Sequence, residues 1–397
     1  MTQTANTPGW ARGMDNIHAA VELGRDTLRQ ATNVDVLDSG KVRTRVGRTL
    51  LSGLVAPHSL WGRHGLGFVV DGSTLYSLDR TGAVAAVVTG LPAQQRTAFV
   101  EVNGDVYYSS MAYNGMIRGG VRYGWTIETP VNLPAPAQIG GALPQGTYTV
   151  SMTYVDILGR EGTASLQVQF TGVGGMTLIG LPVPVSNQIV AKRIYITDVD
   201  GEIQQRAIEL PANAAFADVT ALAFGPVLKT EGKGDIAFGD SLAYYNVQVF
   251  IGSGVYVFFT DDLTYHLMNQ NQSWYIFPAP VTAVIGMRDG IYVCADRIYF
   301  LSDAGTEKAT QKKVFDFGAY HGSVAAVPNS TDSIVMTARG ALQLSDGGVV
   351  HLLGEGRYIP GTPSQTAAII REHNGVRQYV CSASNVAPNN LAIGASA

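Results

Sequence analysis

Charged side chains are scarce in this sequence. Only 15 % of its 397 residues are Asp, Glu, Lys or Arg, against about 25 % in a typical globular chain. The formal net charge of −4 at pH 7 argues against a protein that binds nucleic acid through bulk positive charge. Hydrophobic residues make up 46 % of the chain, which is too large a share for a disordered protein.

Cysteines and long apolar runs are rare as well. Cys294 and Cys381 each lie in an alternating apolar stretch, which favours two buried reduced thiols over a disulfide and offers no metal-ligand spacing. The longest apolar run, 83–88, has only the length of a strand, so we expect no membrane-spanning helix. The first residues lack the basic and apolar regions of a secretory signal, which predicts synthesis in the cytoplasm.

Glycine and short alternating runs are what the sequence has in abundance. Glycine occupies 46 of the 397 positions, well above the usual share of about 7 %. Strand-length runs recur every 8–12 residues, and three of them share one pattern: an apolar strand, an Asp-Gly or Asn-Gly turn, and a strand with Tyr, at 69–78, 101–109 and 287–293. Such repeats predict an all-β chain with a β-propeller-like domain.

The middle of the chain has a different pattern of strand-length runs. A long alternating strand at 146–155 is followed by several short strands over roughly 80 residues, which is typical of an immunoglobulin- or fibronectin-like β-sandwich. We therefore expect this sandwich at 140–228 as an insertion. The propeller would comprise 49–135 and 235–397, the latter with a C-terminal tail.

Residues 1–48 have too few spaced apolar residues to form a core of their own, and we interpret them as an assembly segment. Its stretch 16–30 fits either an amphipathic helix or an irregular segment, because Gly24 weakens the helical pattern. Residues 34–46 predict a hairpin turning at 38–40. Its basic strand suits a contact with nucleic acid, an acidic neighbouring subunit or simply solvent.

No catalytic or metal-binding constellation is apparent. His58 and His64 flank Leu60-Trp61 and are either part of a site or ordinary turn or surface residues. None of the histidines lies in a metal-binding motif. The Gly-rich stretch 172–175 precedes a strand, so we interpret it as a hairpin loop and not a phosphate cradle. The acidic stretches 198–202 and 261–262 are typical of turns. We expect no enzyme activity, no cofactor and no metal.

Several motifs resemble those of tailed-bacteriophage virion proteins. Residues 28–36 and 40–49 are similar to the opening "aNvdld.aG.lr.RpG.t" of those proteins, although Val46 stands where proline is common. The stretches 146–162 and 259–267 also look like theirs. The resemblance implies a non-enzymatic component of the tail nozzle, tip or hub, located in the virion, which assembles as a homo-oligomeric ring with other tail proteins and contacts the host surface.

The expected assembly contacts combine apolar and basic residues of the N-terminal segment: Trp10, Ile17, Leu28, Lys41, Arg43, Arg45 and Arg48. We expect the arginines to pair with acidic groups on a neighbouring subunit or tail protein, since the guanidinium fork binds carboxylates bidentately. We expect no membrane span and no sequence-specific nucleic-acid partner.

The alternative is that the chain is a β-propeller tail protein that binds a receptor, or that binds or cleaves a glycan. It would use aromatic side chains that stack on sugar rings, although such residues also serve as core. The candidates are Trp61, Trp125, Tyr265, Trp274 and Tyr275.

Overall fold

The computed structural model describes residues 9–384, apart from 11, 20, 25, 32–33, 37–39, 45–52, 94, 223–224 and 374–375. Two predicted contact residues, Arg45 and Arg48, lie outside the described residues. The described part of the chain is all-β, with 3-10 turns η1 (Asp346–Gly348) and η2 (Leu353–Gly356) as its only helical elements.

Five four-stranded antiparallel sheets, here called blades, contain most of the described strands, and each is a simple meander. Blade 1 consists of β3 (Pro57–Arg63), β4 (Leu66–Asp71), β5 (Thr74–Leu78) and β6 (Val84–Val88). Blade 2 consists of β7 (Ala98–Val102), β8 (Asp105–Ser109), β9 (Asn114–Arg118) and β10 (Val121–Tyr123). Blade 3 consists of β16 (Ser241–Tyr245), β17 (Gln248–Ser253), β18 (Tyr256–Phe259) and β19 (Trp274–Ile276).

The remaining strands of the ring follow in chain order. Blade 4 consists of β20 (Ala283–Gly286), β21 (Gly290–Cys294), β22 (Ile298–Ser302) and β23 (Thr310–Phe315). Blade 5 consists of β24 (Ala325–Ala326), β25 (Ser333–Thr337), β26 (Gly340–Ser345) and β27 (Val349–Leu352). A two-stranded unit, the closing hairpin, consists of β28 (Gln365–His373) and β29 (Val376–Ser384).

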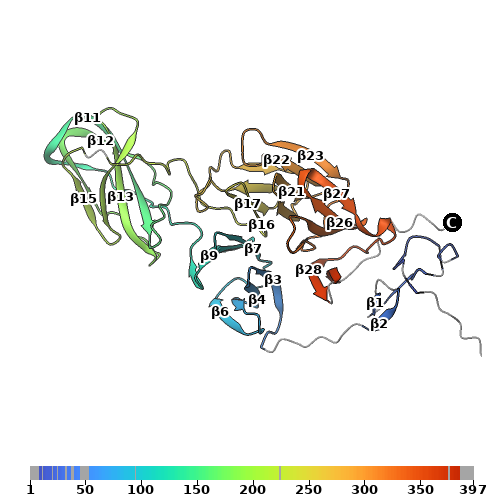
Figure 1. The fold of residues 1–397 in the computed structure, drawn as a ribbon. Helices are drawn as coiled ribbons and strands as arrows, with labels where there is room; N and C mark the ends of the chain where they lie inside the picture. The colour runs from blue at the N-terminus through green and yellow to red at the C-terminus, as the bar shows by residue number, and fades with distance from the viewer. Residues whose placement is uncertain are drawn as a thin grey trace, which may run out of the picture.

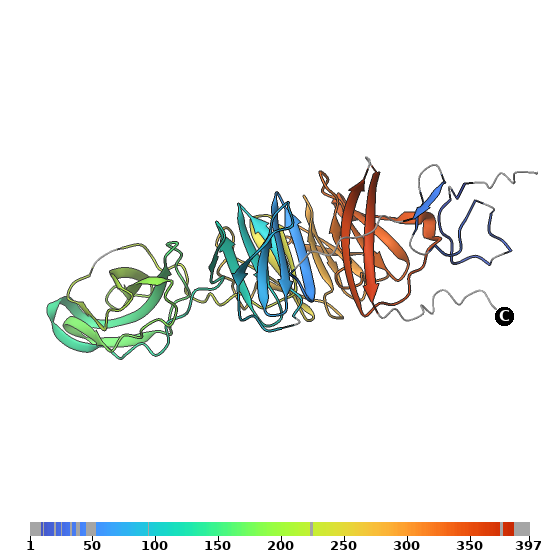
Figure 2. The same ribbon diagram turned by 90° about the horizontal axis from the view of Figure 1, so that it is seen from below.

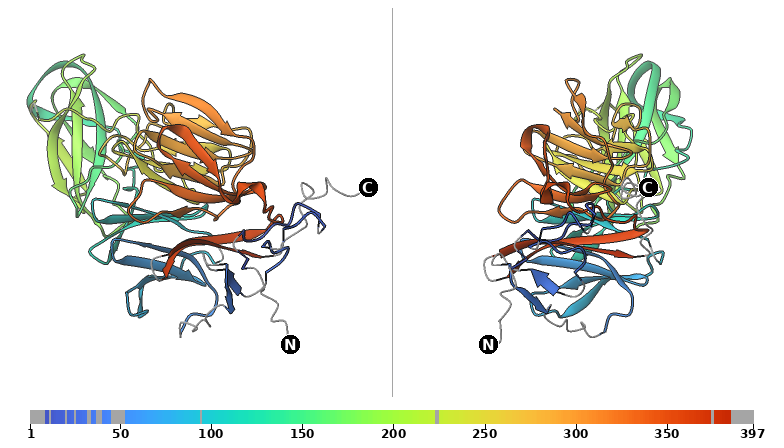
Figure 3. Two further views of the ribbon diagram at one scale, coloured as in Figure 1. Left: turned by 45° about the vertical axis from the view of Figure 1, so that its right-hand side comes forward. Right: turned by 90° about the vertical axis from the view of Figure 1, so that its right-hand side faces the viewer.

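The blades stand around a common axis as in a β-propeller. The first strand of one blade contacts the first strand of the next from β3 to β7, β7 to β16 and β16 to β20, and β24 contacts β28. Both views of Figure 3 show the red closing hairpin between blade 5 and the blue strands of blade 1. The expected β-propeller-like domain is therefore present.

The hydrophobic core lies between neighbouring blades. Separate clusters of buried residues join blades 1 and 2, 2 and 3, 3 and 4, and 4 and 5. For example, Phe68 of blade 1 stacks on Phe99 of blade 2 with ring centroids 6.0 Å apart. Because each strand presents alternate side chains to opposite faces, one blade packs against both of its neighbours.

The Asn-Gly turn between β7 and β8 explains why a repeat was visible in the sequence. Asn103 and Gly104 adopt φ angles of 54° and 85°, the left-handed values that a two-residue hairpin turn requires. The strands on either side pair in register from Val102 with Asp105 to Ala98 with Ser109.

The inserted domain is one antiparallel sheet in the order β14-β13-β11-β12-β15. Its strands are β11 (Ala137–Asp156), β12 (Val168–Ile179), β13 (Ile189–Thr197), β14 (Gln204–Pro211) and β15 (Phe216–Val219). They enclose a core of their own around Tyr148, Met152 and Ile194. The two separate sheets of an immunoglobulin-like sandwich are not confirmed.

Gly172, Gly174 and Gly175 lie inside β12, so the expected hairpin loop at 172–175 is wrong. They pair with β11 where its register shifts twice, between Ile139 and Gly146. Gly174 has a φ of +91°, and a Cβ there would lie 3.0 Å from the backbone oxygen of Ile139. Glycine thus permits a bulged, sharply bent strand pair.

The N-terminal segment contains the short hairpin β1 (Val34–Val36) and β2 (Val42–Thr44), which pair as the sequence predicts. The described residues of 16–30 form no helix, so the helical alternative is wrong and the irregular one is right. Figure 1 shows β1 and β2 at the end of the molecule opposite the inserted domain, and Figure 2 shows the same separation from below.

Candidate assembly site at the N-terminal segment

Backbone hydrogen bonds fold the N-terminal segment onto itself. The Trp10 N–H donates to the Gly40 carbonyl at 2.7 Å, and the Leu28 N–H donates to the Gly13 carbonyl at 2.8 Å. The side chains of Trp10, Ile17 and Leu28 are half-buried. The structure thus brings Trp10 to the hairpin turn, and the apolar members of the predicted contact set are partly covered by their own chain.

The basic members differ in exposure. Lys41 is exposed and Arg43 is half-buried on β2. Within the described residues no ion pair joins Lys41 or Arg43 to an acid, and the Arg43 Nε has no hydrogen-bond partner. The exposed Lys41 is therefore accessible to an acidic group outside this chain, whereas the Nε atom of Arg43 is buried.

Asn16 fixes the segment to the propeller. Its side-chain amide donates to the Ile359 carbonyl at 2.8 Å, and its side-chain oxygen accepts from the Ile359 N–H at 2.9 Å. The Asn16 N–H also donates to the Arg357 carbonyl at 3.0 Å. The sequence carries no signal for this contact, because its partners lie 343 residues apart.

Asp15 shapes the backbone next to that anchor. It is 4 % exposed, and its Oδ1 accepts from the N–H groups of Ile17 and His18 while its Oδ2 lies 2.8 Å from His18 Nδ1. Burial alone would raise the pKa of Asp15, but the hydrogen bonds from His18 and Ile17 outweigh it and lower the pKa. The carboxylate therefore holds the turn that presents Asn16.

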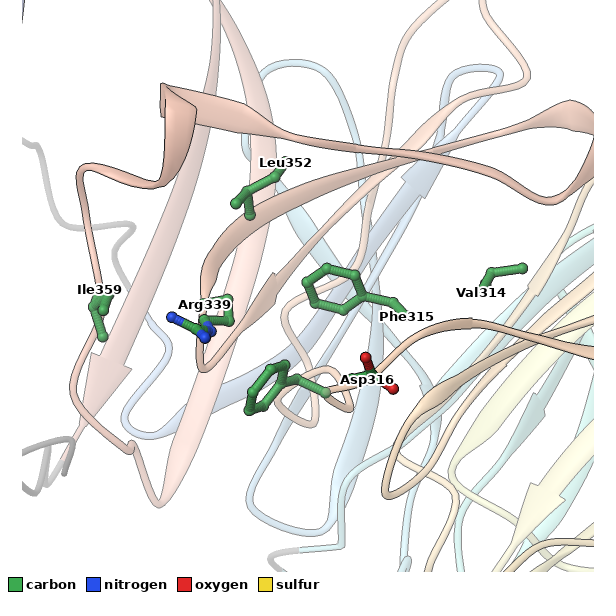
Figure 4. Close-up of a pocket in the computed structure, with 7 residues that line it drawn as sticks. Val314, Phe315, Asp316, Arg339, Leu352 and Ile359 are labelled. Carbon is green, nitrogen blue, oxygen red and sulfur yellow. The ribbon is translucent and has the colours of Figure 1, made fainter. Parts of the chain in front are cut away.

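A cavity of about 250 Å³ lies beside the anchored loop. The Arg339 guanidinium carbon stands 5.3 Å from the centroid of the Phe317 ring, a cation–π contact. Figure 4 shows Arg339, Phe315 and Leu352 around one space, with Ile359 at its edge. Its lining comprises Val314, Phe315, Asp316, Phe317, Arg339, Leu352 and Ile359.

The two flanking histidines do not form a site together. His64 Nδ1 lies 2.7 Å from a Glu101 oxygen, whereas His58 Nδ1 lies 2.8 Å from the Ser59 hydroxyl. The described residues contain no group of three or more potential metal ligands, and both cysteines are free. No helix in the described ranges is long and apolar enough to cross a membrane.

Most of the candidate aromatic residues serve as core. Trp125 is fully buried, and its indole N–H donates to the Tyr265 carbonyl at 2.6 Å. Trp61 stacks on Phe68, and Tyr275 stacks on Phe259. Trp274 differs, because it is 40 % exposed beside Tyr256 at a centroid distance of 5.9 Å.

Comparison with known proteins gives no family. No family model matches the sequence, and no curated protein matches it either. Among solved structures, the Neurospora crassa Pan2 WD40 domain is similar with 12 % identity, covering 84 % of this chain and 91 % of that one, at a TM-score of 0.34.

Two further solved structures are similar to the same degree. The β-propeller domain of Myceliophteria thermophila Cps50 (Swd1) has 11 % identity, 80 % and 90 % coverage and a TM-score of 0.34. Virginiamycin B lyase from Staphylococcus aureus has 11 % identity, 75 % and 83 % coverage and a TM-score of 0.32. Similarity this low indicates nothing about function.

Proposed function

We propose that this chain is a non-enzymatic structural component of a bacteriophage tail that assembles as a ring with other tail proteins. One observation carries the proposal. The N-terminal segment is anchored to the propeller through Asn16 and Ile359. Its hairpin β1–β2 lies at the end of the molecule remote from the inserted domain and carries Lys41 and Arg43, for which the described residues provide no acidic partner. Such a chain has two distant ends with which to contact neighbours.

Ion pairs and apolar contacts would contribute differently to binding at the N-terminal segment. An exposed Arg–carboxylate pair contributes only about 0–1 kcal/mol, so Lys41 and Arg43 would set register and orientation. Affinity would come from apolar surface, at roughly 25 cal/mol for each Å² buried. The half-buried Trp10, Ile17 and Leu28 retain area for this purpose. The resemblance of 28–36 and 40–49 to tail proteins also supports a contact role for the N-terminal segment.

The alternative, a glycan-binding propeller, is favoured by one observation. Tyr256 and Trp274 are 38 % and 40 % exposed on adjacent strands of blade 3 and meet edge to face. Exposed rings of this kind provide faces on which sugars stack. This candidate predicts loss of host-surface binding in Trp274→Ala with tail assembly intact.

Deletion of residues 1–48 tests the proposed function. The blades make their interblade cores without this segment, so the truncated chain should unfold cooperatively while being absent from purified particles. The double variant Lys41→Gln/Arg43→Gln should reduce incorporation without changing the melting temperature. Incorporation of the truncated chain at the wild-type level would contradict the assignment.

A further inference from the structure

Polar side chains from different blades converge where the inner strands begin. His58 and Ser59 open β3, Arg96 precedes β7, Asp240 precedes β16 and His321 precedes β24. Inner strands of a propeller run in the same direction, so their first residues meet at one end of the axis. His58, Arg96, Asp240 and His321 are here called the axial cluster.

Contacts between the blades bring these residues together. The Thr97 N–H donates to the Ser59 hydroxyl oxygen at 2.9 Å, which joins blade 2 to blade 1. His321 Nε2 lies 3.5 Å from an Asp240 oxygen, which joins blade 5 to blade 3. The Thr366 hydroxyl donates to the His321 carbonyl at 2.7 Å, which adds the closing hairpin.

Arg96 reaches across the axis to the opposite side of the ring. A Cβ placed on Gly322, in blade 5's leading loop, would lie 2.4 Å from Arg96 Nη1, so glycine is what allows the guanidinium to lie there. Arg96 is solvent-exposed, and no hydrogen bond or ion pair engages it within the described ranges. Desolvation by the surrounding strands nevertheless lowers the pKa of Arg96, partly offset by the Asp240 charge.

His58 adds a second unused donor. Its Nδ1 lies 2.8 Å from the Ser59 hydroxyl, and its buried Nε2 has no partner among the residues described. The Ser59 oxygen already accepts from Thr97, so its own hydrogen is free to be donated to His58 Nδ1, which leaves the ring proton on Nε2. The Asp240 carboxylate has a neighbour of its own, His321, whose Nε2 lies 3.5 Å from it.

We propose that the axial cluster binds a small oxyanion, a carboxylate or a phosphate, through the Arg96 guanidinium and the His58 Nε2–H. A planar guanidinium binds either oxyanion bidentately, and the buried His58 Nε2, which has no partner among the described residues, is the second donor. The Arg96 charge acts on the His58 ring, which indicates that the two groups are near each other. This inference is independent of the proposed tail role.

Acidification should strengthen binding. Desolvation lowers the pKa of His58, while the Asp71 charge raises it and the Arg96 charge lowers it again. His58 is therefore neutral at pH 7 and gains a positive charge as the pH falls below its ordinary value of 6.5.

Isothermal titration calorimetry of the full chain with succinate, and separately with inorganic phosphate, tests the site. We expect one of the two anions to bind at one site per chain, tenfold or more weaker in Arg96→Met and partly restored in Arg96→Lys. The exposed Arg80 lies elsewhere on blade 1, so Arg80→Met should bind normally. Near-ultraviolet circular dichroism should show that all three variants fold.

The outcomes separate the possible ligands and can refute the site. Binding of succinate alone assigns a carboxylate ligand, and binding of phosphate alone assigns a phosphate ligand. Binding of neither by the wild type, or equal weakening in Arg80→Met and Arg96→Met, would overturn the proposal. Arg96→Met should still enter particles normally, so failure here leaves the tail role untouched.

Discussion

At the scale of single residues, a few buried polar side chains hold the separate parts of the chain together. Arg160 pairs with Asp156 at 2.7 Å and donates to the Gly124 carbonyl at 2.8 Å. His266 Nε2 donates to the Glu161 carbonyl at 3.0 Å. These contacts join the inserted domain to blades 2 and 3 and restrict its orientation.

His266 should make folding stability depend on pH. Desolvation and the Arg160 charge lower its pKa from 6.5 to about 4. The unfolded chain therefore binds more protons between these values, so stability is complete above pH 6.5 and falls as the pH drops toward 4. The loss should be on the order of 3 kcal/mol.

The matched variant is His266→Gln, whose amide keeps an N–H donor but does not titrate. Chemical denaturation at pH 4 to 7 should show the wild-type free energy of unfolding falling more steeply with acid than that of the variant. Parallel curves for the two proteins would contradict this role of His266.

Asn16 is the second residue with a testable role. Asn16→Ala removes the two hydrogen bonds to Ile359, each worth about 0.5–1.5 kcal/mol, and should release the N-terminal segment while the blades stay folded. Limited proteolysis should then cut before residue 50 much faster than in the wild type. The control is Asn271→Ala at an exposed loop position, and similar cleavage of both variants would argue against the anchor.

At the scale of elements, short hairpins could be predicted and long-range contacts could not. The Asn103-Gly104 turn and the hairpin β1–β2 follow from local residue types. The Gly-rich stretch 172–175 suggested a loop, because the bend of β11 against β12 that requires these glycines cannot be seen in the sequence. Asn16 gave no signal, and of the axial cluster only His58 drew attention in the sequence, because the partners of these residues are distant in sequence and meet only when the ring closes.

The inserted domain is an element whose removal the propeller should tolerate. Its entrance and exit lie side by side, since the Ile236 N–H donates to the Thr126 hydroxyl at 3.3 Å. Replacing residues 128–234 with a Gly-Ser linker should leave one cooperative thermal transition, with some loss of stability because Leu158 no longer packs near Trp125. Absence of any cooperative transition would show that the propeller needs the insertion.

At the scale of the whole molecule, the arrangement is a rigid ring of blades with one attachment at each end. Interblade cores fix the ring, Asn16 holds the N-terminal segment on one side, and Arg160 and His266 hold the inserted domain on the other. A component of this form can hold its neighbours at fixed positions relative to one another. Closed rings of identical subunits require two different faces on each copy, which this elongated layout provides.

Electron microscopy of purified particles tests the central claim most directly. An epitope tag inserted at the exposed loop position 271 would be located with a specific antibody. The account predicts labelling at the tail, at several positions around the tail axis, and no labelling when residues 1–48 are deleted from the tagged chain. Particles that lack the tagged wild-type chain, or carry it anywhere other than the tail, would contradict the account.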